Sequence, residues 1–323
     1  MHGLTDVEGM LVGHATDREA ITGCTAILCP PGGAVAGVDV RGMASGGMQL
    51  DVLAPLHSNE RIHGICLSGG SAFGLEAGAG VMRFLESKGM GFPVGAAGAV
   101  VPLVPTAIIF DLSLAKKKGA RPNREMGERA AAAASSAAVE EGSVGAGTGA
   151  TVGKLFGLAR AMKGGLGSAT VWLDGPMAGV RVAALAVVNA FGDVRDPESG
   201  HILAGARVST GDREFADSAF EIKRGARGGF NFNNTTLVVV ATNARLNKVQ
   251  ATRLAQQASI GVAKTISPVW TASDGDICFA LSAGDLEADP MALGIAAAEA
   301  VAQSIVRAVL RARTLGGVPG LAD

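Results

Sequence analysis

The feature that most constrains the fold is a series of short apolar runs, bounded by glycine or proline, that recurs along the chain. They include CTAILCP, GAVAGVDVRG, IHGICLSGG, SATVWLDG, VRVAALAVVNAFGD, TTLVVVATN and DGDICFALSAG. Runs of this length and β-branched content are typical of strands, several of them buried on both faces. Helical patterns alternate with them without a strict strand–helix–strand rhythm. This order favours a layered α/β sandwich over a doubly wound parallel sheet.

Helical patterns cover residues 71–89, 123–142, 247–266 and 289–313. The second is an alanine-rich run ending at Gly142, and the third opens on Asn247 as its N-cap. The fourth has a strong start signal, Asp289 as N-cap followed by Pro290 at the first helical position. The polar stretch 209–234 is typical of a linker, but no segment on either side of it is predicted to fold alone. We therefore expect a single domain, residues 1–323.

Composition decides what fills the core. Hydrophobic residues make up 48 % of the chain and aromatic residues only 4 %, and tyrosine is absent. The core must therefore be packed from Ala, Val, Leu and Ile. The 47 glycines follow no period, which excludes collagen and solenoids. Their clusters beside apolar runs indicate tight turns and close backbone approach around a site.

Charge and hydropathy patterns exclude several classes of partner. The net charge is −1, so no basic field indicates nucleic acid. The most apolar window, 99–115, is interrupted by Pro102, Pro105 and Asp111, so no membrane span is expected. The N-terminus lacks a basic head followed by an apolar stretch, which makes the cytoplasm the expected location. The cysteines are expected to be buried free thiols of a reducing compartment: Cys24, Cys29, Cys66 and Cys278.

Two familiar phosphate-binding patterns fail on inspection, and no cofactor is expected. In VGAGTGATVGK the dinucleotide-type spacing is present, but a helix-like alanine run precedes it where a strand is required. The P-loop pattern fails at Thr148, where glycine is needed, and at Leu155, where Ser or Thr is needed. The histidines never fall at metal-ligand spacings, so no metal site is expected. Ser71 in SGGSAFGL misses the nucleophile-elbow spacing, because Phe73 occupies the second glycine position.

The stretch NFNNTTLVVVATN, residues 231–243, places polar residues directly before a buried strand. A threonine hydroxyl is a poor nucleophile unless a base takes its proton. Cleavage just before Thr235 would free an α-amine, whose ordinary pKa of about 7.7–8.0 suits that task. A linker leading into a rigid strand start fits this arrangement. The alternative is a polar turn whose side chains bond to backbone groups.

Three further segments supply candidate partners for such a nucleophile. Asp274 and Asp276 flank Gly275 and share one strand face, so both could orient a single amine or hydroxyl, although the pattern also fits a turn. Lys154 lies in a glycine-rich segment and is either solvated or directed at a site. Asn189 ends an apolar run, either as a turn residue or as a donor to an oxyanion.

Taken together, LSGGSAFGLEAGAGV, VPTAIIFDL, GAGTGATVGK, LAVVNAFGDV, NTTLVVVATNA and DGDICFALSAG occur in an order and spacing that resemble the DmpA-like family of self-processing aminopeptidases and amidases. The nearest branch is the nylon-oligomer hydrolases. The resemblance implies a four-layer αββα sandwich and self-cleavage between Asn234 and Thr235, with chains 1–234 and 235–323 staying associated. It also implies that Thr235 is the nucleophile, with Lys154 and Asn189 beside it and Asp274 and Asp276 orienting it.

The resemblance further implies a cofactor-free hydrolase of small peptides, amino-acid amides or oligoamides, assembled as a homotetramer. Phe110 stands where nylon-oligomer hydrolases carry tyrosine, which changes the expected substrate preference. Phe110 and Ser71 are the weaker candidates for the substrate pocket. The alternative function is a non-catalytic protein that binds a small anionic ligand on the same scaffold.

Overall fold

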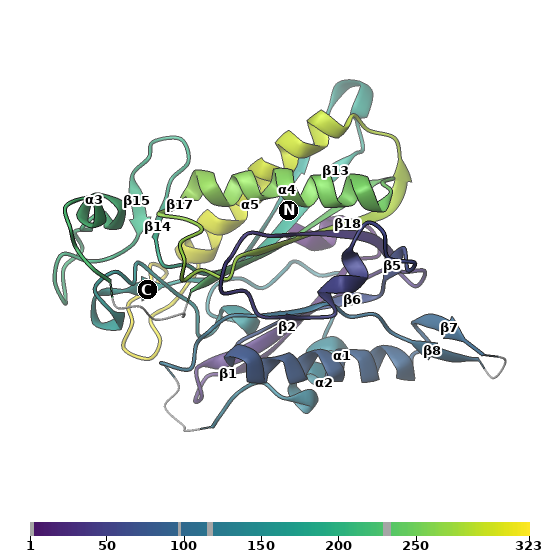
Figure 1. Cartoon of the computed structure of the whole chain (residues 1–323), viewed down its shortest axis with the longest axis horizontal. Helices are drawn as coiled ribbons and strands as arrows, with labels where there is room; N and C mark the ends of the chain where they lie inside the picture. Colours follow the sequence, from purple (N-terminus) through teal and green to yellow (C-terminus); the bar gives the residue numbers. More distant parts are fainter. Residues whose placement is uncertain (1–2, 96–97, 115–118, 229–233) are drawn as a thin grey trace.

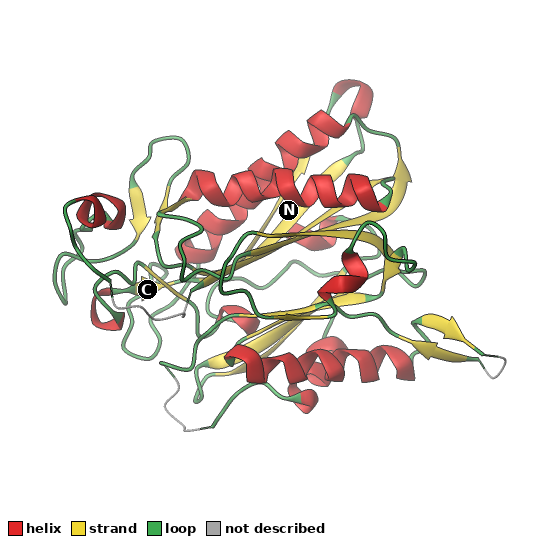
Figure 2. Cartoon of the chain, viewed as in Figure 1, coloured by secondary structure: helices red, strands yellow, loops and turns green. Residues whose placement is uncertain are grey.

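In the computed structural model, which describes residues 3–95, 98–114, 119–228 and 234–323, two β-sheets face each other and a pair of helices covers the outer face of each (Figures 1 and 2). The order of layers is helix, sheet, sheet, helix. The predicted four-layer αββα sandwich is therefore confirmed.

The first sheet has five strands in the order β1-β2-β6-β9-β4. β6 and β9 are parallel, and the other neighbours are antiparallel. Helices α1 and α2 cover its outer face and cross closely, because a Cβ on Gly80 or Gly127 would collide with backbone of the other helix. The bounds are β1 Leu11–Asp17, β2 Thr22–Leu28, β4 Gly47–Met48, β6 Gly64–Ser68, β9 Thr106–Ile108, α1 Glu76–Ser87 and α2 Arg124–Ala132.

The second sheet has six strands in the order β12-β13-β16-β18-β3-β5, with β16 and β18 parallel at its centre. Helices α4 and α5 cover its outer face (Figure 1). Asn247 caps α4, and Asp289 caps α5 ahead of Pro290, as predicted; Gln250 completes a capping box with Asn247. The bounds are β3 Ala34–Val40, β5 Arg61–Ile62, β12 Gly165–Trp172, β13 Arg181–Asn189, β16 Thr235–Ala244, β18 Ile277–Leu286, α4 Lys248–Thr265 and α5 Pro290–Leu310.

Smaller elements decorate the ends of the sandwich. At one end lie β14, β15 and β17, which form a three-stranded sheet, together with α3 (Figure 1). At the other end the β7–β8 hairpin extends away from the body. The bounds are β7 Phe92–Val94, β8 Ala99–Val101, β10 Thr151–Val152, β11 Met162–Lys163, β14 Asp193–Arg195, β15 Ile202–Ala204, β17 Ile266–Ser267 and α3 Ser218–Lys223. Short 3-10 turns cover 3–6, 50–53, 71–75, 145–147, 158–160 and 175–177.

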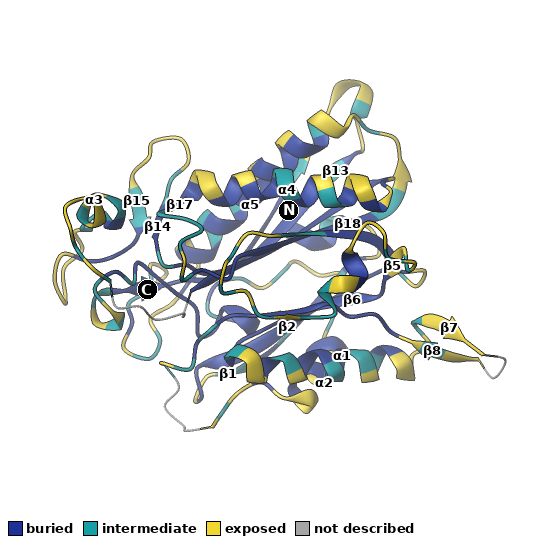
Figure 3. Cartoon of the chain, viewed as in Figure 1, coloured by how far each residue is buried: buried dark blue, intermediate teal, exposed yellow. Residues whose placement is uncertain are grey.

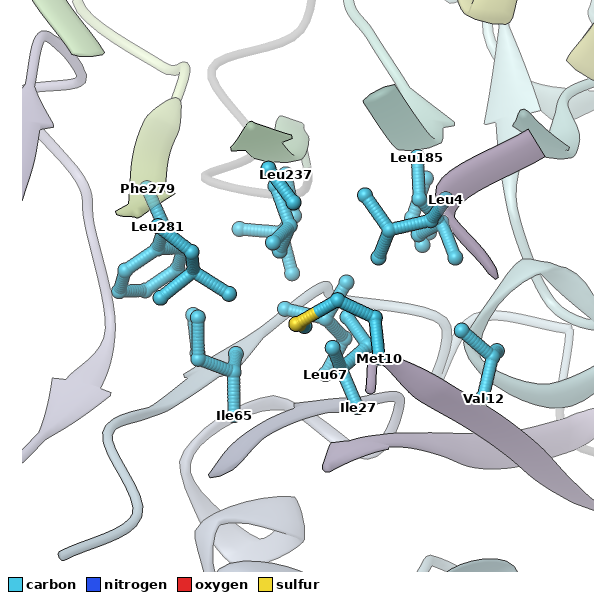
Figure 4. Close-up of a cluster of buried hydrophobic side chains, with 14 of the residues drawn as sticks. Leu4, Met10, Val12, Ile27, Ile65, Leu67, Leu185, Leu237, Phe279 and Leu281 are labelled. Atoms are coloured by element: carbon cyan, nitrogen blue, oxygen red, sulfur yellow. The ribbon is translucent and has the colours of Figure 1, made fainter. Parts of the chain in front are cut away.

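The main core lies between the two sheets. Leu67 and Ile27 of the first sheet face Leu237 and Phe279 of the second (Figure 4). The inner strands are buried almost throughout (Figure 3). A second core, richer in alanine and valine, lies between the second sheet and α4 and α5. All four cysteines are buried free thiols, as predicted.

Helix α5 is long and apolar enough to cross a membrane by length and composition alone. In the structure, 67 % of its apolar window is buried inside the protein. Its buried residues join the cluster formed with α4 and the second sheet. The apolar face of α5 therefore belongs to the protein core.

The helix predicted over 123–142 is only half correct. Helix α2 ends at Ala132, and the following residues leave the helical path. Ser135 exchanges two backbone hydrogen bonds with Val12, both of 3.1 Å, at the edge of the first sheet. Pairing with that edge strand satisfies the backbone groups and overrides the helix propensity of the alanine run. The segment 209–234 is also more structured than a linker, since it contains α3; residues 229–233 lie outside the described part.

Candidate active site

Thr235 is the first residue of the central strand β16, and it is 4 % exposed. On one side, the register pairs Thr235 with Asn189, the last residue of β13. On the other side, Asn234 forms a bridge with Asp274, just before β18. Sheet pairing therefore brings together residues that are far apart in the sequence. All of them lie where strands of the second sheet begin or end, on the same side of the sheet.

The Thr235 hydroxyl donates a hydrogen bond to the carbonyl oxygen of the preceding residue, Asn234. The Gly275 N–H donates to the same oxygen at 2.9 Å. A Cβ on residue 275 would lie 2.9 Å from Thr235 Oγ1 and 2.7 Å from the Ala44 carbonyl oxygen. Glycine is thus the residue that lets this backbone N–H approach the Asn234 carbonyl beside the hydroxyl.

The two carboxylates that flank Gly275 are both buried, but their hydrogen bonds go to different segments. Asp276 Oδ1 accepts the backbone N–H of Thr236. Asp274 Oδ2 accepts from the backbone and hydroxyl of Thr271, at 2.8 and 2.7 Å. Burial and the neighbouring Asp274 charge together raise the pKa of Asp276 to about 8, although the Thr236 hydrogen bond and Lys154 oppose them. Asp276 is therefore expected to keep its proton near neutral pH.

Lys154 and Asn189 contact each other directly. Lys154 Nζ donates to the Asn189 backbone oxygen at 2.9 Å and to Oδ1 at 2.8 Å. The Asn189 amide nitrogen donates to the Phe110 carbonyl oxygen at 3.2 Å, and Oδ1 also accepts the Thr151 N–H at 3.0 Å. The Asn189 amide thereby fixes the position of the lysine. Its predicted role as an oxyanion donor stays a prediction.

The pKa of Lys154 is lowered to about 7, chiefly by burial. Lys163 acts in the same direction as burial, whereas the charges of Asp274, Asp111 and Asp276 oppose it. A lysine of this kind changes its charge near neutral pH, which is a property of groups at catalytic sites.

A cavity of about 170 Å³ opens beside Lys154 and Asn234. Its wall is mixed, with aromatic and aliphatic side chains next to charged ones: Phe110, Asp111, Ser113, Leu114, Gly149, Thr151, Lys154, Gly157, Leu158, Phe191 and Asn234. Phe110 lies in the cavity wall, and its role in a substrate pocket stays a prediction. Ser71 is not among the lining residues; it starts the 3-10 turn 71–75 with a φ of 54°, and its N–H donates to the Ile109 carbonyl oxygen.

Sequence reasoning missed three residues of this region. Gly275 had appeared only as the spacer between two aspartates. Asp111 is a buried carboxylate in the cavity wall, and its signal was a lone charge inside an apolar window. Lys163 is a fully buried lysine, and nothing local in the sequence marks it. Within the part of the chain that the structure describes, no three His, Cys, Asp or Glu side chains gather as a metal site would require.

A buried hydroxyl beside a carbonyl, a lysine of lowered pKa and a carboxylate pair together form the kind of side-chain set that supports acyl transfer. Two solved structures resemble the chain. A β-aminopeptidase of Burkholderia sp. superposes with a TM-score of 0.73 at 25 % identity, covering 99 % of this chain and 90 % of the other. The L-aminopeptidase D-Ala-esterase/amidase of Ochrobactrum anthropi, described as a variant of the Ntn-hydrolase fold, gives 0.75 at 19 % identity and supports the fold alone. It covers 98 % of this chain and 88 % of its own.

Fold and site define a hydrolase of peptide or linear amide bonds. Residues 2–322 match the model of peptidase family S58, and the chain belongs to this family. An uncharacterized aminopeptidase of Mycobacterium leprae (strain TN) is 38 % identical over 354 residues, 99 % of this chain and 93 % of that protein. A 6-aminohexanoate-oligomer endohydrolase of Kocuria sp. (strain KY2) is 31 % identical over 328 residues, 94 % of this chain and 84 % of the relative. The expected family is confirmed, and the alternative of a non-catalytic binding protein is set aside.

Proposed function

We propose that this hydrolase activates itself by cleaving the Asn234–Thr235 bond, and that the freed Thr235 then serves as the nucleophile toward substrate. One observation carries the proposal: the Thr235 hydroxyl contacts the Asn234 carbonyl while the Gly275 N–H donates to its oxygen at 2.9 Å. A hydroxyl and a backbone donor at one carbonyl are the components that acyl transfer needs.

In the first stage, Thr235 Oγ1 attacks the carbonyl carbon of Asn234. The carbon–nitrogen bond to Thr235 breaks, an ester to the hydroxyl forms, and the nitrogen takes the proton that the hydroxyl releases. Water then hydrolyses the ester. The products are chain 1–234, ending in a carboxylate, and chain 235–323, which begins with a free α-amine.

In the second stage, the α-amine accepts the Thr235 hydroxyl proton as the oxygen attacks a substrate carbonyl. The proton passes to the leaving amine, and water releases the acyl group from the oxygen. Lys154 adds positive charge nearby, which lowers the pKa of the α-amine and keeps it neutral. Asp274 and Asp276 oppose that effect, so their role is to position the amine and the hydroxyl.

The developing negative charge on the substrate carbonyl needs hydrogen-bond donors. The Gly275 N–H and the Asn189 amide are the proposed donors, each worth about 3–4 kcal/mol when well placed. Asn189 has a second task, because its carbonyl oxygens hold Lys154 at 2.8 and 2.9 Å.

The substrates are proposed to be small peptides, amino-acid amides or short oligoamides. The relatives are named as an aminopeptidase and a 6-aminohexanoate-oligomer endohydrolase, so both classes are represented among similar chains. A cavity of about 170 Å³ with Phe110 and Phe191 in its wall suits one acyl unit with an apolar portion. The homotetramer and the cytoplasmic location stay predictions from the sequence.

The test is a panel of para-nitroanilides and amides of L-, D-, β- and ω-amino acids, assayed with the wild type and three variants. Thr235→Ala should abolish turnover of every substrate, whereas Thr235→Ser should retain part of it. Thr236→Val is the matched control at the neighbouring hydroxyl, and it should remain active. Full turnover by Thr235→Ala would refute the assignment of the nucleophile.

A further inference from the structure

Three glycine-rich or apolar segments that are distant in the sequence converge on the carboxylate of Asp111. The Gly70 N–H donates to Oδ1 at 2.7 Å, and the Thr22 hydroxyl donates to Oδ2 at 2.6 Å. A Cβ on Gly69 would lie 2.1 Å from Oδ2, and one on Gly149 would lie 2.4 Å from the Asp111 Cβ. The glycines therefore leave room for this one carboxylate, which is only 3 % exposed.

Asp111 is also placed beside the site. It lines the same cavity as Lys154, and Lys163 lies within its electrostatic reach. Lys163 is fully buried and donates to the Thr148 carbonyl oxygen at 2.8 Å, next to the Gly149 that packs on Asp111. A half-buried lysine and a buried carboxylate thus line one cavity, and a second, fully buried lysine lies within electrostatic reach of the carboxylate.

We infer that Asp111 is a positioning residue that keeps Lys154 protonated beside Asn189 by offsetting the positive charge of Lys163. The inference rests on the proposed function, because the charge of Lys154 affects turnover only if Thr235 and its α-amine carry the reaction. Asp111 acts on Lys154 only through its charge, and it is not itself a catalytic residue.

Four titratable groups act on Lys154, and they come from different elements. Asp274 and Asp276 flank Gly275, Asp111 follows β9, and Lys163 ends β11. Each of the three carboxylates favours the protonated lysine when it is ionised, and protonated Lys163 disfavours it. The pKa of Asp111 is raised, chiefly by burial, while its two hydrogen-bond donors and Lys163 limit that rise.

Replacing Asp111 by asparagine removes the charge and keeps the shape. The amide can still accept from the Gly70 N–H, and the Thr22 hydroxyl can rotate to accept from the new NH₂ group. Lys154 then faces Lys163 with one less anion nearby. Its pKa is expected to fall by about one unit, the low end of what a close charge produces.

The experiment measures the protonation of Lys154 directly, in the full-length protein. The protein is pulsed with trace acetic anhydride at a series of pH values, and mass spectrometry gives the fraction of Lys154 acetylated. Asp193→Asn is the matched control, because Asp193 is equally buried and accepts from the Ala206 N–H and from Ser218, yet it is not among the charges that act on Lys154.

The inference predicts that the labelling midpoint moves to lower pH in Asp111→Asn and stays at the wild-type value in Asp193→Asn. An unchanged or raised midpoint in Asp111→Asn, or an equal shift in both variants, overturns it. If Asp111→Asn does not fold, Lys163→Gln decides instead: removing that cation should move the midpoint to higher pH, and no upward shift overturns the inference.

A second readout separates this inference from the proposed function. In the wild type and Asp111→Asn, the pH profile of turnover on the best para-nitroanilide should shift in parallel with the labelling midpoint. If the wild type turns over no substrate, the proposed function fails while the labelling result still decides the electrostatic link. If labelling shifts and the pH profile does not, Lys154 charge does not control turnover and the positioning role is overturned.

Discussion

The backbone N–H of Gly275 donates a hydrogen bond of 2.9 Å to the carbonyl oxygen of Asn234, the carbonyl that the Thr235 hydroxyl also contacts. This contact joins the end of the segment that precedes β16 to the turn that precedes β18. It exists because β16 and β18 are parallel neighbours, so the N-terminal ends of both strands lie side by side. The donor is therefore placed by sheet topology.

The first prediction concerns that donor. Gly275→Ala should slow self-cleavage by about a hundredfold, because the added methyl group must displace the Ala44 carbonyl or the Thr235 hydroxyl by a substantial fraction of an ångström. Gel electrophoresis over time after rapid purification measures the cleavage rate. Gly32→Ala is the matched control, since a Cβ there meets nothing within 4 Å. Equal self-cleavage rates for the two variants would show that the Gly275 N–H does not assist the cleavage.

The second prediction concerns the carboxylate pair. The folded-state pKa of Asp276, about 8, lies above its ordinary value of 3.8, so the folded protein binds more protons between these values. Stability must therefore fall as pH rises from about 4 through about 8. In Asp276→Asn the side chain does not titrate, so stability does not fall with pH for this reason. The asparagine oxygen can still accept the Thr236 N–H.

This variant should therefore have a higher Tm than its parent at pH 9, with a smaller difference at pH 5; in a chain that keeps Thr235, the same substitution should lower activity. Both proteins are compared in the Thr235→Ala background, so that self-cleavage does not alter the chains being melted. A Tm difference that is the same at both pH values would show that Asp276 is ionised throughout that range.

The third prediction concerns Lys163, whose pKa burial lowers from 10.5 to about 7. Between these values the unfolded chain binds the extra proton, so stability rises with pH by about 1.4 kcal/mol per unit for this group. Lys163→Gln should lose that contribution. Urea unfolding at pH 8, 9 and 10 measures the slope, again in the Thr235→Ala background. A slope identical to that of the parent would contradict the lowered pKa of this buried lysine.

The fourth prediction is a stability effect without a functional one. Asn247→Ala removes the side chain that accepts the Gln250 N–H at the start of α4. The expected loss is about 1 kcal/mol, with turnover unchanged because α4 packs on the outer face of the sheet. Thermal melts and the para-nitroanilide assay check both parts. Lost activity at full stability would mean that α4 acts on the site.

Much of the fold was predictable, because short β-branched runs and strong helix caps are local signals. Asn247 and Asp289 mark the starts of α4 and α5 in sequence and structure alike. The early end of α2 at Ala132 was not predictable, since it depends on Ser135 pairing with Val12, a contact between residues more than a hundred positions apart.

The candidate site was predictable in part for the same reason. Thr235 and the aspartates around Gly275 are marked by polar residues at strand starts, a local pattern. Asp111 and Lys163 are recognisable only once the sheets are stacked, because burial and mutual charge define them. The glycines around Asp111 form visible clusters in the sequence, but the sequence does not show that they surround this carboxylate.

The most direct measurement is the mass and N-terminal sequence of the freshly purified protein under denaturing conditions. The account predicts two chains, residues 1–234 and a second that begins at Thr235, with Thr235→Ala remaining as one chain. An active wild type that stays a single uncut chain of 323 residues would contradict it.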